Sequence, residues 1–451
     1  MTGRFFDPGY GLKAREVART LQAIGPLRFG IDDRFWAYED GVWSPADALV
    51  HKRIVRLLDE RYRPHHAQTV REVLRAELDP LEIAPVEMFI NVYNGMIDWR
   101  HGELLPHNEL YFSTVQLPVT YHPEAECKHF DAFLAESVAP DDIARVWEMI
   151  GYLMLSGNPL QRTFLLTGGG GNGKGVLLEV VKHLLGSSAI AAVPLHEFAI
   201  SQFATAELFG KLANICGDID AQFIESTARI KEITGEDTVK GERKFGQPFY
   251  FRPWCKMIFS ANEIPAAADS SSGWTRRFEV VGFPNRPRYP DSTLKDRLTT
   301  TAELRGVAAH AVAALRVLMS RREFSHGAAA AAAHEQFRVI NNKVLEWIAE
   351  TCDYPNPTKW YDRRDLYKAY KRWDAEYGGG RPLGSKRFYG LLRQVEGMRE
   401  TRHDGQFGFR GLRLRLDIAY GVALDGRDTD GGQDYSAPVL PPDDNQLDLG
   451  F

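Results

Sequence analysis

The chain has 451 residues, of which 44% are apolar and 25% charged, and its formal net charge is −5. This ordinary globular composition predicts roughly two to four domains, and it excludes nucleic-acid binding through the field of the whole chain, so any such contact requires local basic patches. Four widely separated cysteines without a Cys-x-x-Cys pair argue against a zinc ribbon or a disulfide framework, and they indicate buried thiols in a reducing compartment.

The sequence carries no sign of a membrane segment. Its N-terminus lacks the apolar core of a signal peptide, and no window approaches the ~18 uninterrupted apolar residues of a membrane span. We therefore expect a cytoplasmic protein with no membrane partner.

Residues 1–138 combine aromatic residues with turn signals and predict an α+β domain. Apolar and polar residues alternate on both sides of Asp40 and Gly41, a pattern typical of a β-hairpin. The segment at residues 51–62 has the spacing of an amphipathic helix.

Residues 139–325 predict an α/β nucleotide-binding core. A helix over residues 139–155 leads into a glycine-rich turn, after which helical and strand-like apolar runs alternate. An alanine run at residues 328–333 then heads a helix that we expect to join this core to a third unit.

The glycine-rich turn has the sequence Thr-Gly-Gly-Gly-Gly-Asn-Gly-Lys-Gly at residues 167–175. Its G-x-x-x-x-G-K spacing is typical of a P-loop, in which backbone N–H groups converge on phosphate oxygens and Lys174 supplies a point charge. The helix that follows directs its positive end at the same phosphates. The residues predicted to contact ATP are Gly168, Gly169, Gly170, Gly171, Asn172, Gly173, Lys174, Gly175 and Val176.

Polar and charged side chains follow further apolar runs of this core. Asp218 and Asp220 come after one run, where a Walker-type ATPase holds Mg²⁺ through water, and Asp218 is the predicted metal contact. Asn262 ends a second buried strand and is suited to orienting the attacking water. Arg276 and Arg277 follow, and could reach across a subunit boundary as arginine fingers. The predicted catalytic residues are Lys174, Asp218, Asp220, Asn262, Arg276 and Arg277.

Residues 238–251 alternate around a turn and predict a second β-hairpin. Cations and an aromatic residue at its tip suit the backbone of single-stranded DNA with one stacked base or sugar, although many exposed hairpins carry charge for solvation alone. The predicted DNA contacts on it are Lys240, Arg243, Lys244 and Phe245.

The order of these parts resembles the superfamily III helicases of DNA viruses, phages and plasmids. A P-loop, a strand followed by acids, a basic hairpin and a strand followed by Asn262 all lie within residues 168–262. The stretches at residues 89–107 and 117–134 are similar to the N-terminal domain of the phage and plasmid primase-helicase branch. With the C-terminal unit included, the resemblance covers residues 25–418.

This resemblance implies an AAA+ protein that hydrolyses ATP with Mg²⁺ at the interfaces of a homo-hexamer. It also implies movement along single-stranded DNA, typically 3′ to 5′, in the cytoplasm of a bacterial host. On the family pattern Lys174 is the Walker A lysine, and Asp218 and Asp220 are the Walker B acids. Lys231 and Lys244 are the lysines of the hairpin-side motif. Asn262 is the sensor, and Arg277 or Arg276 is the finger.

The chain departs from the family pattern in three places. Gly175 lacks the hydroxyl that usually contacts Mg²⁺, so the metal site should be richer in water and weaker without being abolished. Walker B has Asp where many relatives have Glu, which leaves the catalytic base open. Fewer than 140 residues precede the helicase region, too few for the primase domain of many relatives, so we expect a separate primase.

Residues 335–418 predict a winged-helix domain. Helices over residues 344–352, 362–377 and 385–395 precede a basic ribbon that turns at Asp404 and Gly405, and Ser385 is predicted to cap the third helix. The alternative is a winged helix that contacts only protein. The cations predicted to contact duplex DNA, origin DNA included, are Lys386, Arg387, Arg393, Arg402 and Arg410.

Residues 419–451 are rich in Asp, Gly and Pro and predict a disordered acidic tail. Its last six residues resemble the peptide by which replication proteins dock on the bacterial sliding clamp. The alternatives are a tail that repels DNA from the wing or that docks on another replication partner. The residues of the predicted clamp contact are Gln446, Leu447, Leu449 and Phe451.

Two functions from different classes are consistent with this pattern. The first is an ATP-driven replicative helicase of a mobile element, which Lys174, Asn262 and the paired arginines favour. The second is a nucleotide-controlled DNA-binding initiator or helicase loader with little unwinding activity, which Gly175 favours. A small-molecule kinase ranks third, because it needs neither an arginine finger nor a wing.

Overall fold

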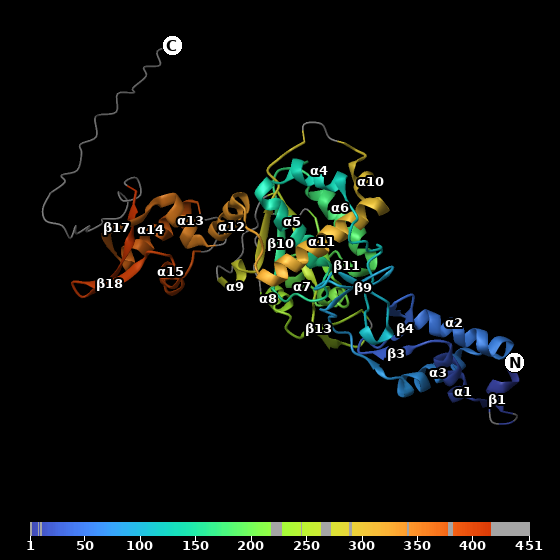
Figure 1. Ribbon diagram of the computed structural model, residues 1–451. Coiled ribbons are helices and arrows are strands. Elements are labelled where there is room, and N and C mark those ends of the chain that lie inside the picture. The colour runs from blue at the N-terminus through green and yellow to red at the C-terminus, as the bar shows by residue number, and fades with distance from the viewer. Residues whose placement is uncertain are drawn as a thin grey trace, which may run out of the picture. The chain divides into compact units, whose positions relative to one another are not determined.

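The computed structural model describes residues 2–7, 9, 11–217, 228–244, 246–262, 272–287, 291–340, 342–377 and 382–415. The chain divides into two compact units, residues 1–342 and residues 343–451 (Figure 1). The predicted domain boundaries within these units stay predictions.

Helices α1, α2 and α3 pack on a sheet of strand order β5-β4-β3-β6 near the start of the first unit. Strands β4 and β5 pair antiparallel, and Asp40 and Gly41 between them have φ values of 51° and 87°, so the predicted hairpin is confirmed. The bounds are β1 Phe6–Asp7, β2 Gly11–Leu12, α1 Ala14–Ile24, β3 Leu27–Gly30, β4 Phe35–Glu39, β5 Val42–Pro45, α2 Asp47–Leu58, α3 Pro64–Glu77 and β6 Pro80–Leu81.

An antiparallel sheet of order β7-β8-β9 follows, and two helices then lead to the central sheet. The predicted helix before the glycine turn is confirmed as α5, which begins at Ile143 because the preceding residues form a short 3₁₀ turn. The bounds are β7 Phe89–Val92, β8 Gly95–Asp98, β9 Glu103–Leu105, α4 Lys128–Ser137 and α5 Ile143–Met154.

A parallel sheet of strand order β11-β12-β15-β10-β16 forms the centre of the first unit. Strand β10 lies between β15 and β16 and runs parallel to both. Its carboxyl end therefore lies beside the carboxyl ends of two strands that come much later in the sequence. The strands are β10 Thr163–Thr167, β11 Ile190–Ala191, β12 Ala213–Cys216, β15 Lys256–Ala261 and β16 Phe278–Gly282. The hairpin strands are β13 Val239–Gly241 and β14 Phe249–Phe251.

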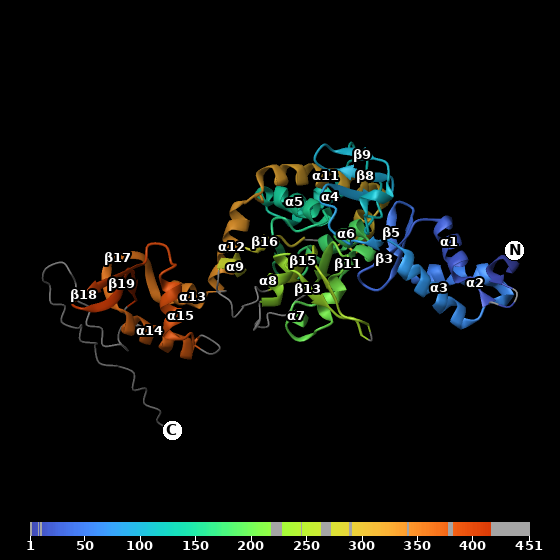
Figure 2. The same cartoon turned by 90° about the horizontal axis from the view of Figure 1, so that it is seen from below.

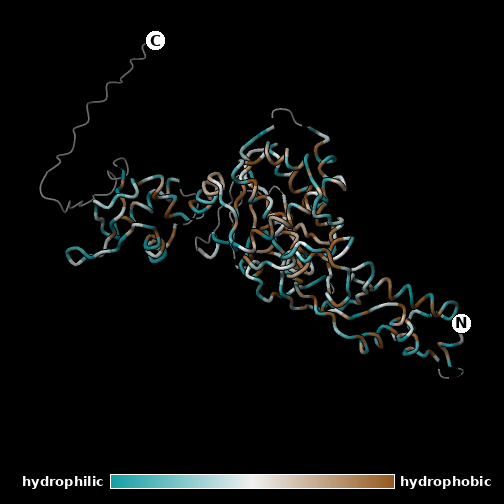
Figure 3. The backbone as a smooth tube through the Cα atoms, in the orientation of Figure 1, coloured by the Kyte–Doolittle hydropathy of each residue, from teal (hydrophilic) through white to brown (hydrophobic). Residues whose placement is uncertain are grey.

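Helices cover both faces of this sheet (Figure 2). Phe164 and Leu166 of β10 pack in a cluster with α4, α5, α6 and α11, whereas Leu165 packs in a second cluster with Phe337 of α12. Both faces of the strand are therefore apolar, as in buried parallel sheets, and hydrophobic segments gather around it in Figure 3. The helices are α6 Lys174–Leu185, α7 Glu197–Ile200, α8 Ala228–Thr234, α9 Ser272–Thr275, α10 Leu294–Leu298, α11 Thr301–Arg321 and α12 Ala328–Ile340.

The second unit packs helices α13, α14 and α15 against an antiparallel sheet of order β17-β19-β18. The turn between β18 and β19 contains Asp404 and Gly405, with φ values of 47° and 80°, as predicted. The bounds are α13 Lys343–Thr351, β17 Cys352–Asp362, α14 Arg363–Glu376, α15 Ser385–Leu392, β18 Arg399–His403 and β19 Gln406–Leu414.

Two local predictions for the second unit were wrong. Ser385 does not cap α15, because it is already the first helical residue and the N-cap position falls on Gly384. The helix predicted to include Cys352 ends one residue earlier, and strand β17 begins there because Cys352 pairs with Leu414 of β19. This pairing is set by tertiary contact and leaves little trace in the local sequence.

The four cysteines are free thiols. Cys127, Cys255 and Cys352 are buried as predicted, and burial raises the pKa of each thiol to about 12. Cys216, at the end of β12, is only partly buried, so the prediction of a buried thiol was wrong there. Among the described helices, none is both long enough and apolar enough to cross a membrane.

Candidate functional site

The glycine-rich turn joins the carboxyl end of β10 to the amino end of α6. Gly168, Gly171 and Gly173 have φ values of 142°, 74° and 99°, which L-residues with side chains rarely adopt. A Cβ atom on Gly168 would also lie 2.5 Å from the Phe283 carbonyl oxygen. The turn therefore requires glycine at these positions for its shape.

The Lys174 ammonium group lies inside this turn. Its Nζ donates to the carbonyl oxygens of Gly168 at 2.5 Å and Gly169 at 3.1 Å, and to Oδ1 of Asn172 at 3.1 Å. It also donates to Oδ1 of Asn262 at 3.3 Å. The predicted lysine and sensor amide are thus adjacent, although 88 positions separate them in the sequence.

The sheet explains why these two residues meet. Strand β15 runs parallel to β10 with Thr167 paired to Ala261, so Asn262 emerges directly beside the start of the turn. Asn172 donates to the Phe283 carbonyl at 2.7 Å, which ties the turn to the end of β16 as well. Polar groups from neighbouring strand ends therefore converge where ligands of open α/β sheets bind.

The predicted Walker B acids follow β12, the strand on the other side of β15. Cys216 of β12 pairs with Phe259, so this strand also ends at the edge that carries the turn. Asp218 and Asp220 lie outside the described residues, and the predicted metal contact of Asp218 stays a prediction.

A cavity of about 450 Å³ opens beside the turn, a size typical of small-ligand sites. The turn and Asn262 form its floor, and α4 contributes Phe133 and Ser137 to its wall. Leu294 and Lys295 of α10 line it from another side. The cavity beside the P-loop-like turn is therefore lined by apolar side chains and by the cation Lys295.

Arg286 is a candidate residue that the sequence reasoning missed. It follows β16, and its Nε lies 3.5 Å from the position that a Cβ on Gly171 would occupy. Arg286 is exposed, so its guanidinium is free to approach a ligand at the turn. In the sequence, Arg286 is marked only by its position shortly after a buried apolar run, and this feature is not enough to identify a phosphate contact.

Arg276 and Arg277 lie at the opposite edge of the sheet from Lys174. They directly precede β16, and Phe278 of that strand pairs with Thr163 at the start of β10. Strand β10 has five residues, which span about 16 Å, more than an arginine side chain can reach. Arg276 is exposed, whereas Arg277 is partly buried and donates to the Gly273 carbonyl oxygen.

The predicted basic hairpin is present as β13 and β14, but its cations have different surroundings. Lys240 pairs with Glu242 at 2.9 Å, and Lys244 is exposed. Arg243 lies over the rings of Phe209 and Phe249, at 5.6 Å and 4.9 Å from their centres. Phe245 lies outside the described residues, and the remaining hairpin-side lysine, Lys231, lies in α8.

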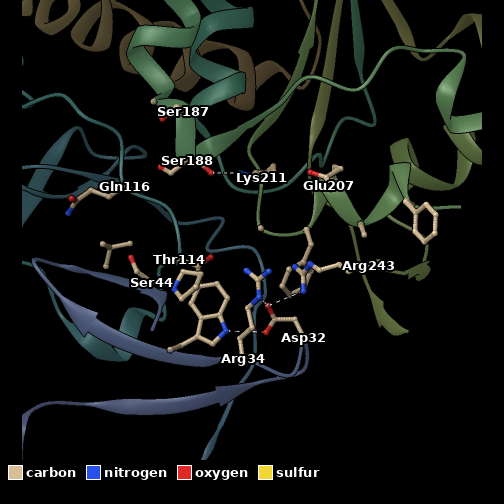
Figure 4. A pocket seen from close by; sticks show the side chains of 18 of the residues that line it. Asp32, Arg34, Ser44, Thr114, Gln116, Ser187, Ser188, Glu207, Lys211 and Arg243 are labelled. Atoms are coloured by element: carbon tan, nitrogen blue, oxygen red, sulfur yellow. Dashed lines mark hydrogen bonds and ion pairs between the residues drawn. The ribbon is translucent and has the colours of Figure 1, made fainter. Parts of the chain in front are cut away.

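Arg243 is directed toward the N-terminal sheet across a pocket of about 950 Å³ (Figure 4). Its guanidinium lies 3.5 Å from Asp32, whose side chain is fully buried and also pairs with Arg34 at 3.7 Å. The Trp36 indole donates to the same carboxylate at 3.1 Å. Burial is the main cause that lowers the pKa of Arg243, the nearby Arg34 lowers it further, and Asp32 opposes the shift.

The predicted cations of the second unit also divide into two groups. Lys386 and Arg387 are exposed on α15. Arg393 binds Glu400 through two hydrogen bonds of 2.7 Å and 3.1 Å, and Arg402 lies over the Phe407 ring. Arg410 is partly buried in β19. Arg393 and Arg402 are exposed as well, so among the five predicted cations Arg410 alone is partly buried.

Comparison with protein families gives two matches. Residues 27–138 match the family described as D5 N terminal like, and residues 166–277 match a family of unknown function, DUF5906. The second match contains the glycine turn, the hairpin and both predicted finger arginines.

Sequence comparison gives a relative from Acanthamoeba polyphaga mimivirus named "Putative helicase L207/L206". It is 26% identical over 165 residues, which cover 35% of this chain. The chain spans only 17% of the length of that relative. This match and the D5 N terminal like match support a relation to the phage primase-helicase type of protein.

Two apo structures of the C-terminal region of NrS-1 are similar in fold. Each has a TM-score of 0.50 and 12% sequence identity, and the similarity covers 88% of this chain and 98% of that chain. At this identity the similarity concerns the mixed α/β fold alone.

Proposed function

We propose that the protein is an ATP-dependent DNA helicase of the superfamily III type that acts in the replication of a phage, prophage or plasmid. The observation that carries this proposal is the position of Lys174, inside a glycine turn and 3.3 Å from the amide oxygen of Asn262. At the carboxyl ends of neighbouring parallel strands, the ammonium group could bind the β and γ phosphates and the amide could orient the attacking water, which are two of the roles that γ-phosphate hydrolysis needs. The viral helicase relative supports the same class.

The residues of the turn fit an ATP phosphate chain. The backbone N–H groups of residues 169–175 and the amino end of α6 would bind the phosphate oxygens, and the Lys174 ammonium would exchange its carbonyl partners for them. Asn262 would orient the attacking water. Arg286 would add a second cation above Gly171.

Mg²⁺, when bound, would neutralise phosphate charge, and Asp218 would hold it through water with Asp220 nearby. The side of α6 that faces the turn offers no hydroxyl at Gly175. This supports a weaker metal site in which water replaces one protein ligand.

The opposite position of Arg276 and Arg277 supports action in trans. Because they cannot reach the turn of their own chain, they could stabilise developing charge only at the turn of a neighbouring subunit. A homo-oligomeric ring, with six subunits on the family pattern, meets this requirement. Movement along single-stranded DNA would use the hairpin, on which Lys240 and Lys244 are exposed cations.

A second candidate function is a nucleotide-controlled initiator or helicase loader that unwinds little DNA. The observation that favours it is Gly175, because a weak metal site lowers the rate of ATP turnover more than it lowers the affinity for the nucleotide. Origin recognition by the second unit, through Lys386 and Arg387, fits either function. We also propose two partners. A separate primase would supply the primers, and the sliding clamp of the host would bind the C-terminal peptide, which lies outside the described residues.

A DNA-stimulated ATPase assay on Lys174→Ala tests the proposed function. The substitution removes the charge inside the turn, so turnover should fall by ~100-fold or more while the fold is kept. Lys182→Ala is the matched control, because Lys182 lies on the same helix at its exposed far end. Turnover of Lys174→Ala equal to that of the control would exclude the turn as the nucleotide site.

A further inference from the structure

Three side chains of types that bind metals meet beside the amino end of α4. Cys127 directly precedes this helix, Asp131 lies one turn later, and His310 comes from α11. The Nδ1 atom of His310 lies 3.7 Å from Sγ of Cys127 and 3.7 Å from Oδ1 of Asp131. The three ligand atoms all lie within 4.8 Å of one another.

The geometry of this cluster does not fit a nucleophilic triad. A triad needs one imidazole nitrogen on the nucleophile and the other on the orienting carboxylate, whereas here the same Nδ1 faces both Cys127 and Asp131. Cys127 is also fully buried, so no substrate can reach its sulfur. The three atoms instead converge on one point between them.

We propose that Cys127, Asp131 and His310 bind a divalent transition-metal ion of the zinc class, with water as the remaining ligand. Thiolate, imidazole and carboxylate are the ligands that Zn²⁺ takes in proteins. With Zn–S of about 2.3 Å and Zn–N of about 2.0 Å, a tetrahedral ion separates sulfur and nitrogen by about 3.5 Å, which is close to the separation present here. On binding, the thiol proton of Cys127 passes to solvent.

The surroundings of the cluster suit such an ion. His310 makes an edge-to-face contact with Trp147 at 5.0 Å, and Trp147 contacts Phe130 in the same way at 5.1 Å, so aromatic rings orient the imidazole. The side chains of Asp131 and His310 are 46% and 44% exposed. One side of the site is therefore open to water while the sulfur side is closed.

The metal would link α11 to α4, and α4 lines the cavity of the candidate nucleotide site. Glu303 of α11 already accepts hydrogen bonds from the backbone N–H groups of His129 and Phe130 in the first turn of α4. Further along α4, Phe133 and Ser137 form the wall of the cavity beside the glycine turn. An ion between α4 and α11 would hold this wall in place. The metal site itself is independent of the proposed ATPase function, and only its effect on the nucleotide rests on that function.

The test uses the full chain without a histidine tag, stripped of metal and titrated with Co²⁺ and then Zn²⁺. We expect one metal ion per chain, a visible spectrum of tetrahedral Co²⁺ with a thiolate charge-transfer band, and displacement of Co²⁺ by Zn²⁺. Cys127→Ser should remove the charge-transfer band. Asp131→Asn and His310→Gln should each weaken Zn²⁺ binding at least ~10-fold.

Two controls keep the result interpretable. Cys352→Ser removes a buried thiol of the second unit and should leave the Co²⁺ spectrum unchanged. Asp131→Asn changes a half-exposed side chain, so it tests the site even if Cys127→Ser does not fold. Absence of the charge-transfer band in the parent chain, or its persistence in Cys127→Ser, would show that the cluster is only a hydrogen-bonded network and would overturn the proposal.

A second readout separates the metal site from the nucleotide proposal. The affinity for a fluorescent ATP analogue is measured with and without Zn²⁺, and we expect Zn²⁺ to tighten binding in the parent but not in Asp131→Asn. If the chain binds Zn²⁺ but no nucleotide, the proposed function fails while the metal site stands. Equal nucleotide affinity with and without Zn²⁺ would overturn the role of the ion in fixing α4.

Discussion

At the scale of the residue, Gly175 is the position where the chain differs most from an ordinary P-loop. It lies in the first turn of α6, and a Cβ built on it has no other atom within 4 Å. Its φ is not in the left-handed region that requires glycine. Neither packing nor backbone conformation therefore explains the absence of a hydroxyl, in contrast to Gly168 and Gly173 in the same turn.

We predict that Gly175→Ser strengthens the metal site. The new hydroxyl can replace one water on Mg²⁺, so the Mg²⁺ concentration that gives half-maximal ATPase activity should fall several-fold. Gly175→Ala is the matched control, because it adds the same helix-stabilising Cβ without an oxygen. An equal Mg²⁺ requirement in the two variants would mean that the hydroxyl has no access to the ion.

Individual site residues could be predicted only where a motif or a strand end marks them. Lys174 and Asn262 were found because glycine spacing and a buried apolar run locate them, and the structure brings them together. Arg286 was missed because no motif precedes it. Arg243 was assigned to the hairpin tip. It also contacts Asp32 and Phe209, which lie far away in sequence, whereas Phe249 belongs to the same hairpin.

At the scale of the element, long apolar runs were the reliable signal. Strand β10 is apolar on both faces because helices cover both, and such a run can be recognised without knowledge of its neighbours. Strand β17 was missed because its sequence contains Pro355 and Pro357. It is an edge strand with register shifts against β19, a place where the sheet tolerates proline.

For the hairpin of β13 and β14 we predict that Lys244→Ala lowers unwinding but not DNA-independent ATPase activity. Lys244 is exposed and lines a pocket with Gly186 and Ser187, which follow the carboxyl end of α6, whereas the glycine turn precedes its amino end. It should therefore contact a DNA phosphate and not ATP. Loss of one phosphate contact should reduce the salt slope of single-strand binding by about 0.7. Fluorescence anisotropy at several salt concentrations measures this slope.

Two variants serve as controls for the hairpin. Arg252→Ala removes a charge just after β14 that is paired with Glu236, and it should leave the salt slope unchanged. Arg243→Ala should instead lower thermal stability, because it removes the group between Asp32 and the rings of Phe209 and Phe249. A Lys244→Ala protein with the parental unwinding rate and salt slope would remove the hairpin from the DNA path.

At the scale of the whole molecule, the parallel sheet separates two groups of predicted site residues, one at each edge. The glycine turn and Asn262 lie at the carboxyl edge, and the paired arginines lie at the amino edge. The sequence places all of these residues near strand ends, but it does not show which edge each one occupies. Only the strand order and register do, because β16 begins where β10 begins.

This separation predicts complementation between inactive subunits. Arg276→Ala with Arg277→Ala should leave nucleotide binding nearly unchanged and lower turnover by ~10³ or more, the usual effect of removing a finger that acts in trans. Lys174→Ala subunits have intact arginines but an inactive turn. In a mixture, an intact arginine edge meets an intact turn at some interfaces, so ATPase activity should return in proportion to their number. Mixtures that stay inactive under conditions where subunits exchange would contradict action in trans, and full activity of the double arginine variant alone would remove both residues from catalysis.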